Sequence, residues 1–359
     1  MKVLFCGGGT AGHVYPNIAI AETLEKNIAS IKFAYAVTEK GIENQLISFE
    51  KHKISVIGIN KGKIFTGLKF IEKMVTSIKE SKRIITAFNP DLIIGTGGFA
   101  TFPIVYAGHK MGIKTVLHES NSTPGRAIKS LERKADLILV NYEETKKYFK
   151  QKNKVKRVGN PLRKEFIDRS DDDSLTIDKS KKVILSIGGS LGAKRLNDAV
   201  LALVDNYLKY QENIVLFFVT GKKDYARVNK LLKIKGNNDN IRVLDFCCNI
   251  PEIMKRADLV ISRAGAMTIS ELAYSKKCSI LIPSPNVANN HQYKNAKLLS
   301  DKDGAVLIKE DELYYLTDKV KYLIENESAR KNYERNIGKF SVQDANKKIC
   351  MEILNLFNI

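Results

Sequence analysis

The sequence predicts an α/β protein built from two Rossmann-like, doubly wound parallel-sheet domains that face each other across a cleft. Short β-branched apolar runs alternate with longer helical stretches along the 359 residues, which is typical of βαβ units. Most of these runs are apolar throughout, as parallel strands are when helices cover both faces of their sheet. The chain also repeats itself: segment 2–12 recurs at 182–192, and segment 91–98 is echoed at 258–265. Each copy runs from a strand into a glycine turn, so each half is expected to form one domain.

The expected strands fall into two sets, one in each half of the chain. The first set is Lys2–Cys6, Lys32–Val37, Ile54–Ile57, Leu92–Gly95, Lys114–Leu117 and Leu137–Val140, and the second is Val183–Ile187, Ile214–Val219, Arg242–Leu244, Leu259–Ser262, Ser279–Ile282 and Ala305–Ile308. A polar stretch at 168–174 is typical of a linker, so we expect domains over 1–163 and 164–341. Apolar positions at helical spacing predict a last helix over Val342–Phe357, and we expect 342–359 to pack back on the first domain.

The composition is that of an ordinary globular chain, with 44% hydrophobic and 27% charged residues. No apolar run approaches the ~20 residues that span a bilayer. The net charge of +20 favours an anionic partner, which can be nucleic acid, an anionic membrane face or a phosphorylated substrate. No nucleic-acid-binding motif stands out, so we expect no nucleic acid as partner. The five cysteines form neither a C-x-x-C pair nor a zinc-type cluster, which favours a reducing compartment.

Glycine turns follow several of the expected strands. Gly7-x-Gly9-x-x-Gly12 matches the dinucleotide fingerprint, and Glu39 lies where a dehydrogenase places its ribose-binding acid, so an NAD(P)-dependent oxidoreductase is one reading. Four glycine turns exceed what one dinucleotide needs, however. Because they lie at strand carboxyl ends, where open α/β sheets bind ligands, they favour two substrates, at least one of them phosphorylated.

Polar residues next to these turns are the candidates for chemistry. His13 follows the first turn and is either structural or a base for a sugar hydroxyl. The cluster His118–Asn121 ends another strand, where polar groups favour a functional role. Glu271 lies early in a helix after a glycine turn, and is either a capping acid or the acceptor of two hydrogen bonds from a ribose diol.

An amphipathic stretch lies between the third and fourth expected strands. Its apolar positions recur at helical spacing from Ile64 to Ile78 and are flanked by lysines. Such a stripe either faces the core or lies in an anionic membrane interface.

The motifs together resemble a known family. In order, they are Gly8-Gly9-Thr10-Ala11-Gly12-His13, Gly95-Thr96-Gly97-Gly98-Phe99, His118-Glu119-Ser120-Asn121, Gly159-Asn160-Pro161-Leu162-Arg163, Gly188-Gly189-Ser190-Leu191-Gly192-Ala193, the run from Arg263 to Glu271, and His291-Gln292-Tyr293-x-Asn295-Ala296. Over essentially the whole chain this order is similar to the MurG family of bacterial peptidoglycan N-acetylglucosaminyltransferases, which belongs to glycosyltransferase family 28 and has the GT-B fold.

The resemblance implies an activity and its partners. These enzymes transfer N-acetylglucosamine (GlcNAc) from UDP-GlcNAc to the C4 hydroxyl of undecaprenyl-pyrophosphoryl-MurNAc-pentapeptide (lipid I), with inversion, and give lipid II. The second domain would hold the nucleotide sugar, and the first would face the lipid acceptor at an anionic membrane surface. The implied location is peripheral, on the cytoplasmic face of the inner membrane, and no cofactor is implied.

The resemblance also assigns residues. His13 is the candidate general base. Substrate binding falls to Thr10, Ala11 and Gly12 in the loop between donor and acceptor phosphates, Glu271 on the ribose, Ser190 and Arg163 near the donor diphosphate, the backbone of Cys247 at uracil, Ala266, Met267, Thr268, Ile269 and Ser270 along the sugar and phosphates, and Gln292 and Asn121 on the GlcNAc. The membrane contact falls to Ile64, Phe65, Leu68, Lys69, Ile71, Lys73 and Val75.

Some positions depart from the family pattern. Leu191 replaces a usual glutamine, Cys247 stands where isoleucine is common, and Lys276-Lys277-Cys278 replaces a more usual turn. Helix N-termini with Arg163 would stabilise the departing diphosphate, so we expect no obligatory metal. A UDP-GlcNAc 2-epimerase of the same fold is a further reading, but the linked patterns His118–Asn121 and Gly159–Arg163 favour the transferase.

Overall fold

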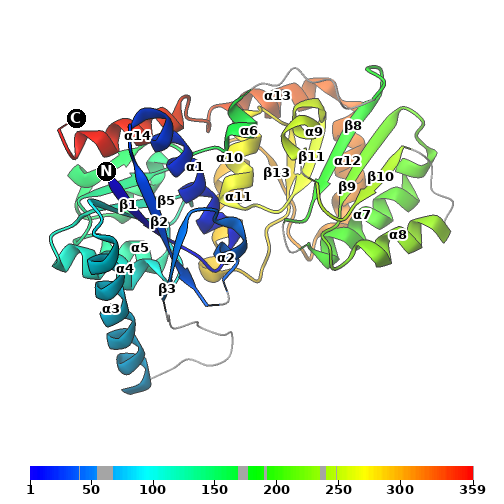
Figure 1. The fold of residues 1–359 in the computed structure, drawn as a ribbon. Coiled ribbons are helices and arrows are strands. Elements are labelled where there is room, and N and C mark those ends of the chain that lie inside the picture. Colours follow the sequence, from blue (N-terminus) through cyan, green and yellow to red (C-terminus); the bar gives the residue numbers. More distant parts are fainter. Residues whose placement is uncertain are drawn as a thin grey trace. The chain divides into compact units, whose positions relative to one another are not determined.

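The computed structural model describes residues 1–39, 41–54, 68–168, 177–189, 192–234, 240–247 and 249–358. It divides into two compact units (Figure 1). Unit 1 is Met1–Lys164 with Val342–Ile359, and unit 2 is Glu165–Ser341. Each unit is a parallel sheet covered by helices, which confirms the predicted class of two parallel-sheet α/β domains.

The sheet of unit 1 has seven strands in the described residues, in the order β3-β2-β1-β4-β5-β6-β7, and every pairing is parallel. Its strands are β1 (Lys2–Cys6), β2 (Lys32–Thr38), β3 (Glu50–Ile54), β4 (Leu92–Gly95), β5 (Lys114–Glu119), β6 (Leu137–Val140) and β7 (Val155–Arg157).

The sequence prediction is incomplete at the two edges of this sheet. The third strand, expected over Ile54–Ile57, already begins at Glu50 and includes Ile54, while 55–57 lie outside the described residues. Strand β7 was not expected at all. Both edge strands expose most of their residues, so they lack the continuous apolar run that marks a strand covered on both faces.

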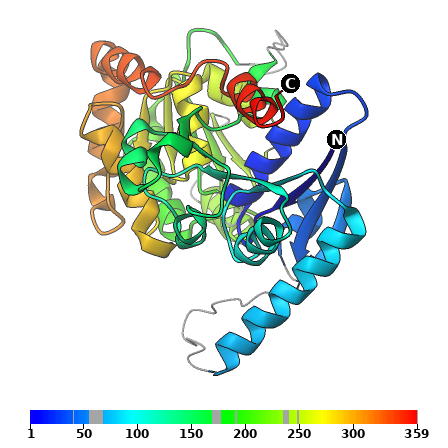
Figure 2. The same cartoon turned by 90° about the vertical axis from the view of Figure 1, so that its left-hand side faces the viewer.

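Helices cover the two faces of this sheet as separate layers (Figure 2). On one face α3 (Leu68–Phe88), α4 (Thr101–Lys110) and α5 (Arg126–Leu131) pack on strand residues such as Leu4 and Ile93. On the other face α1 (Ala11–Asn27) and α14 (Ala345–Asn355) pack on Val3, Phe5 and their neighbours. The alternation follows from the two-residue period of a strand, because successive side chains point to opposite faces.

The C-terminal helix α14 is shorter than the expected Val342–Phe357, and it contacts α1. Asn346 holds it to the end of the first sheet. Its amide accepts from Leu162 N at 2.9 Å, and donates to Leu162 O at 2.9 Å and to Thr23 Oγ1 at 3.0 Å. Two apolar contacts, Ile349 and Ile353, complete the packing.

Unit 2 repeats this plan with six strands in its described part, in the order β10-β9-β8-β11-β12-β13. They are β8 (Lys182–Ile187), β9 (Ile214–Val219), β10 (Ile241–Leu244), β11 (Leu259–Ser262), β12 (Ser279–Leu281) and β13 (Val306–Leu307). One face of the sheet packs on α7 and α12. The helices are α7 (Lys194–Asn206), α8 (Tyr225–Ile234), α9 (Ile250–Arg256), α10 (Ala266–Tyr274), α11 (His291–Ser300), α12 (Leu316–Glu325) and α13 (Glu327–Gly338). Short helices in the two units are α2 (Glu43–Leu46), α6 (Lys164–Ile167), and the 3-10 turns η1 (Glu143–Tyr148), η2 (Lys152–Lys154), η3 (Leu208–Tyr210), η4 (Ala288–Asn290) and η5 (Leu313–Tyr315).

The internal repeat has a physical basis in one aspartate of each unit. Asp91 accepts from Lys2 N at 2.7 Å, and Asp258 accepts from Val183 N at 2.8 Å. Each aspartate thereby fixes the start of its strand beside the first strand of its sheet. The strand order reverses at this pair in both units, and open α/β sheets bind their ligands at the carboxyl ends of such a pair.

Candidate functional site

Two glycine turns meet at the carboxyl ends of β1 and β4 in unit 1. The amide of Gly8 donates to the carbonyl of Gly97 at 3.3 Å. Gly98 has a φ of +83°, and a Cβ atom there would lie 2.2 Å from the carbonyl oxygen of Gly8. The backbones approach so closely that a larger residue at Gly98 would displace the first turn.

The ring of His13 lies over this junction, in the first turn of α1. Nδ1 is 2.9 Å from the carbonyl oxygen of Thr96, and the Thr96 hydroxyl donates to the His13 carbonyl at 2.5 Å. Because a carbonyl only accepts, Nδ1 carries the proton of the neutral imidazole and Nε2 carries the lone pair. This tautomer suits a base that receives a proton at Nε2.

A buried hydrogen-bond network holds the Thr96 side chain in place. The Asn17 amide donates to Thr96 Oγ1 and to the Tyr35 hydroxyl, both at 3.0 Å. Tyr35 in turn donates to the carbonyl of Gly7 at 2.5 Å, and burial raises the pKa of its phenol. The network joins α1, β2 and both glycine turns, so it fixes the place of His13 in the sheet.

The acid beside the first turn is Glu43, which the sequence analysis did not single out. Its carboxylate is fully buried and accepts from Gly9 N at 3.3 Å and from Thr38 N at 2.9 Å. A Cβ at Gly8 would lie 2.7 Å from this carboxyl group. Glu39, the predicted ribose-binding acid of the oxidoreductase reading, is exposed. Glu43 reaches the glycine turn only through the tertiary fold, 34 residues away along the chain, so no local sequence pattern indicates its role.

The cluster at the end of β5 contains His118, which is held by a backbone carbonyl, and Glu119, which accepts hydrogen bonds from the following loop. His118 is buried, with Nε2 3.1 Å from the carbonyl of Gly159, and burial lowers its pKa to about 4. Glu119 accepts from Asn121 N at 2.9 Å, from Asn121 Nδ2 at 3.0 Å and from Gly125 N at 2.7 Å. Burial raises the pKa of this carboxyl group. Asn121 itself is half-buried, so Glu119 orients a side chain that a ligand can reach.

Arg163 and the first loop lie in unit 1 as well. The guanidinium carbon of Arg163 is 4.9 Å from the centre of the Tyr15 ring, a cation–π geometry. Thr10 and Gly12 are exposed and Ala11 is half-buried. These residues are therefore accessible at the same sheet edge as His13.

In unit 2 the predicted residues gather around α10, which begins directly after β11 and Gly265. Ala266, Met267 and Ile269 turn their side chains into the core, so these three offer only backbone to a ligand. Thr268, Ser270 and Glu271 are half-buried on the accessible side of the helix. The first N–H groups of such a helix have no carbonyl within the helix to bind, which favours an anion there.

Two further predicted residues lie on neighbouring segments of unit 2. Gln292, in the first turn of α11, accepts from Ser284 N at 2.8 Å through Oε1. Cys247 is half-buried in the loop after β10. Ser190 and Leu191 lie outside the described residues.

The predicted membrane contact falls partly on α3. Ile71 and Val75 are 59% and 45% exposed, and Lys73 is exposed between them. Ile64 and Phe65 lie outside the described residues, and the backbone places Leu68 and Lys69 in the first turn of α3. Among the described residues, no helix has the length and apolar character needed to cross a bilayer. No three His, Cys, Asp or Glu side chains gather as metal ligands in that part of the chain.

Comparison with known proteins decides the family. The model of the glycosyltransferase family 28 N-terminal domain matches residues 3–140, and that of the family 28 C-terminal domain matches residues 183–349. The chain belongs to glycosyltransferase family 28. Among family 28 relatives, a Bacillus cytotoxicus protein is 39% identical over 87% of this chain and 87% of its own length. A Thermoanaerobacter protein is 36% identical over 97% and 98%. Both are named UDP-N-acetylglucosamine–N-acetylmuramyl-(pentapeptide) pyrophosphoryl-undecaprenol N-acetylglucosamine transferase.

Solved structures agree on the fold of this family 28 chain. The crystal structure of Acinetobacter baumannii MurG superposes with a TM-score of 0.78 at 24% identity, and covers 99% of both chains. A UDP-GlcNAc 2-epimerase from Neisseria meningitidis, bound to UDP-GlcNAc, superposes at 0.66 with 15% identity over 99% and 100%. The matches to the family 28 models and relatives confirm the predicted family. The superposition on the MurG crystal structure confirms the predicted GT-B fold.

Proposed function

We propose that this family 28 enzyme transfers GlcNAc from UDP-GlcNAc to the C4 hydroxyl of the MurNAc sugar in lipid I, with inversion, to give lipid II for peptidoglycan synthesis. The observation that carries the proposal is 36–39% identity, over most of the chain, to relatives named for this transfer. The epimerases share the fold at 15% identity and support no more than the fold.

His13 is the base in this proposal. Its Nδ1–H is committed to the Thr96 carbonyl, so the lone pair lies on Nε2. The C4 oxygen of the acceptor attacks the anomeric carbon from the face opposite UDP, the bond from that carbon to the UDP oxygen breaks, and the hydroxyl proton passes to Nε2. A single displacement of this kind inverts the anomeric centre. His118 is a poor alternative, because it is buried and its pKa is lowered.

Unit 2 holds the donor in this proposal. Glu271 accepts from the ribose hydroxyls, the Cys247 backbone meets uracil, and Gln292 with Asn121 contacts the GlcNAc. The N-terminus of α10, with Ser190 and Arg163, stabilises the negative charge that grows on the departing UDP. In unit 1, Thr10 to Gly12 face the phosphates of the acceptor.

The oxidoreductase reading is disfavoured by Glu43. A dinucleotide needs its pyrophosphate near the glycine turn, but here a buried carboxylate already accepts from the Gly9 amide. A second negative charge beside it would be repelled. The acceptor phosphates are therefore expected at the accessible residues Thr10 to Gly12, and not beside Glu43.

The direct test is transfer of radiolabelled GlcNAc from UDP-GlcNAc to a lipid I analogue. His13→Ala should lower kcat by about 10²–10⁴-fold, the usual contribution of a general base, with little change in UDP affinity. Glu271→Ala should raise the KM for UDP-GlcNAc. Nicotinamide cofactor binding, or transfer that persists in His13→Ala at the wild-type rate, would contradict the assignment.

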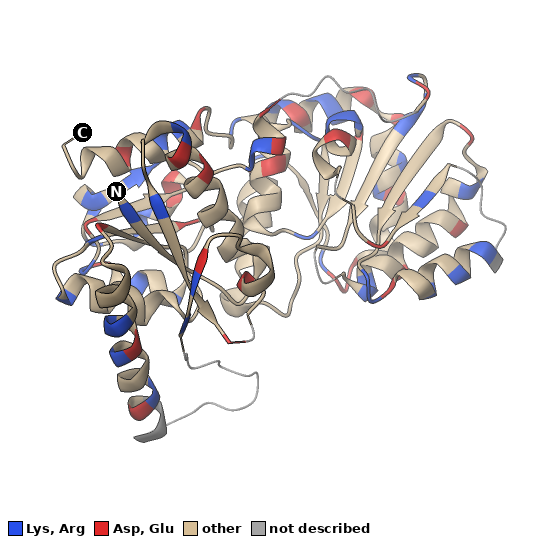
Figure 3. Cartoon of the chain, in the orientation of Figure 1, with Lys and Arg blue, Asp and Glu red and all other residues tan. Residues whose placement is uncertain are grey.

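Charge asymmetry in unit 1 supports an anionic membrane as partner. The layer over one sheet face, residues 68–88, 101–112, 126–134 and 143–154, carries fifteen lysines and arginines against five acids, half of the net charge of the chain. The helices of the opposite face, α1 and α14, carry three of each sign. Figure 3 shows the basic residues along α3, whose first turns extend past the sheet of their own unit. The enzyme would thus lie peripherally on the cytoplasmic face of the inner membrane.

Vesicle binding tests this contact. Lys69, Lys73 and Lys79→Glu together should weaken binding to phosphatidylglycerol vesicles strongly, because each basic residue near such a surface contributes about 1 kcal/mol. Lys347 and Lys348→Glu on α14 change charge on the opposite face and serve as the control. Undiminished binding by the α3 variant, or equal loss in the control, would reject the proposed orientation.

A further inference from the structure

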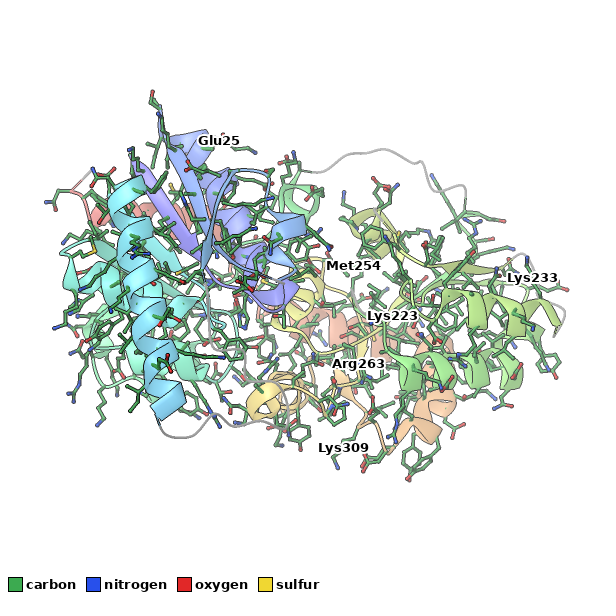
Figure 4. All side chains as sticks on the ribbon, turned by 60° about the horizontal axis from the view of Figure 1, so that its bottom comes forward. Glu25, Lys223, Lys233, Met254, Arg263 and Lys309 are labelled. Atoms are coloured by element: carbon green, nitrogen blue, oxygen red, sulfur yellow. The ribbon has the colours of Figure 1, made fainter. Side chains whose placement is uncertain are left out.

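A mostly buried arginine directly follows β11, between the segments proposed to bind the donor. Arg263 is only 13% exposed, and Figure 4 labels it within unit 2. Its Nη1 donates to the carbonyls of Ile282 and Pro283, at 3.2 and 3.4 Å. Its Nη2 pairs with the carboxylate of Glu310, which is 10% exposed. A guanidinium with so little exposure to water is stabilised by a neighbouring carboxylate, which offsets the loss of its hydration.

Arg263 and Gln292 both hydrogen-bond to the peptide unit between Pro283 and Ser284. The carbonyl of Pro283 and the amide of Ser284 belong to the same planar unit. Arg263 donates to the oxygen of this unit, and Gln292 Oε1 accepts from its N–H at 2.8 Å. A rotation of the peptide would therefore move both partners, so Arg263 sets the orientation of the Gln292 side chain.

Glu310 also faces a second cation from another segment. Its Oε2 lies 3.8 Å from Nη1 of Arg195, in the first turn of α7 behind the glycine turn 188–192. One carboxylate after β13 thus faces an arginine in the first turn of α7 and an arginine that directly follows β11. Through Arg263 it also reaches the segment after β12. The chain after β11 leads into α10, and the chain after β12 leads into α11 with Gln292.

We propose that Glu310 is a positioning residue for the sugar of the nucleotide donor. It holds Arg263 on the Pro283–Ser284 peptide, and that peptide holds Gln292 toward the sugar. The inference rests on the proposed function, because it takes Gln292 as a sugar contact. Glu310 itself touches no substrate, so its loss should act on the sugar more than on the nucleotide.

The test compares binding of UDP-GlcNAc with binding of UDP by isothermal titration. Glu310→Ala should weaken UDP-GlcNAc binding by about tenfold, as a modest misplacement of one contact does, and UDP binding by less than about threefold. The KM for the lipid acceptor should stay unchanged. Glu310→Gln keeps an oxygen for Arg263 and should restore part of the UDP-GlcNAc affinity.

Leu323→Ala is the control for a loss of stability alone. Leu323 is fully buried in α12 and takes part in none of these hydrogen bonds or ion pairs, so its truncation should lower the Tm without changing the ratio of the two affinities. If Glu310→Ala does not fold, Glu310→Gln and Arg263→Lys provide the same comparison. A wild-type ratio in the Glu310 variants, or the same change in Leu323→Ala, overturns the inference. A wild-type enzyme that binds neither ligand would instead refute the proposed function.

Discussion

Gly97→Ala tests directly whether the place of His13 controls the reaction. The φ of Gly97 is +104°, and a Cβ there would lie 2.9 Å from Cε1 and 3.0 Å from Nδ1 of the His13 ring. Non-bonded carbon atoms prefer about 3.5–4.0 Å, so the ring would move by roughly 0.5–1 Å. The 2.9 Å contact between Nδ1 and the Thr96 carbonyl would then stretch beyond hydrogen-bond range.

The size of the effect follows from this displacement. A misplacement of about 1 Å at a reacting group can cost ~100-fold in rate, so we expect kcat to fall by about 10–100-fold. UDP affinity should stay unchanged, because the donor is assigned to unit 2. Backbone strain adds about 1–2 kcal/mol of lost stability, since alanine tolerates this φ poorly.

Gly112→Ala separates strain from displacement. Gly112 has a φ of +77°, and no heavy atom lies within 4 Å of the position of its Cβ. Both variants should lose similar stability in thermal melts, and only Gly97→Ala should lose kcat in the radiolabel assay. Combined with His13→Ala, Gly97→Ala should cause little further loss. Equal kcat in the two glycine variants, or additive losses with His13→Ala, would refute the reasoning.

Three other predictions follow from the buried acids and from Cys247. UDP should slow alkylation of Cys247 in a Cys248→Ser background, because Cys6, Cys278 and Cys350 are buried; unchanged labelling would place uracil elsewhere. Glu43→Ala should lower the free energy of unfolding by about 1–3 kcal/mol, since it leaves buried amides without an acceptor, and chemical denaturation measures this. Burial raises the pKa of Glu119 above 4.5, so its contribution to stability is present below the unfolded pKa and is lost as pH rises through the folded pKa. Unfolding of Glu119→Gln should therefore show a smaller loss of stability with rising pH than wild type, and an identical pH dependence would contradict the shift.

Local patterns in the sequence were enough for much of the fold. Buried central strands such as Lys2–Cys6 and Leu92–Gly95 are found where the apolar runs predict them, because a strand covered on both faces must be apolar throughout. Residues 50–53 of edge strand β3 and all of edge strand β7 were not predicted, because one side of each strand is exposed to water and polar residues are tolerated there.

The sequence by itself determined the two-domain α/β class, the family, and the positions of the glycine turns, since each is written in contiguous residues. Only the tertiary structure decided which groups support the site. Thr96 orients His13 from 83 residues away, Glu43 meets Gly9 from 34, and Glu310 pairs with Arg263 from 47. Such pairs arise because parallel strands, distant along the chain, end at one edge of a sheet, and periodicity along a chain carries no trace of that meeting.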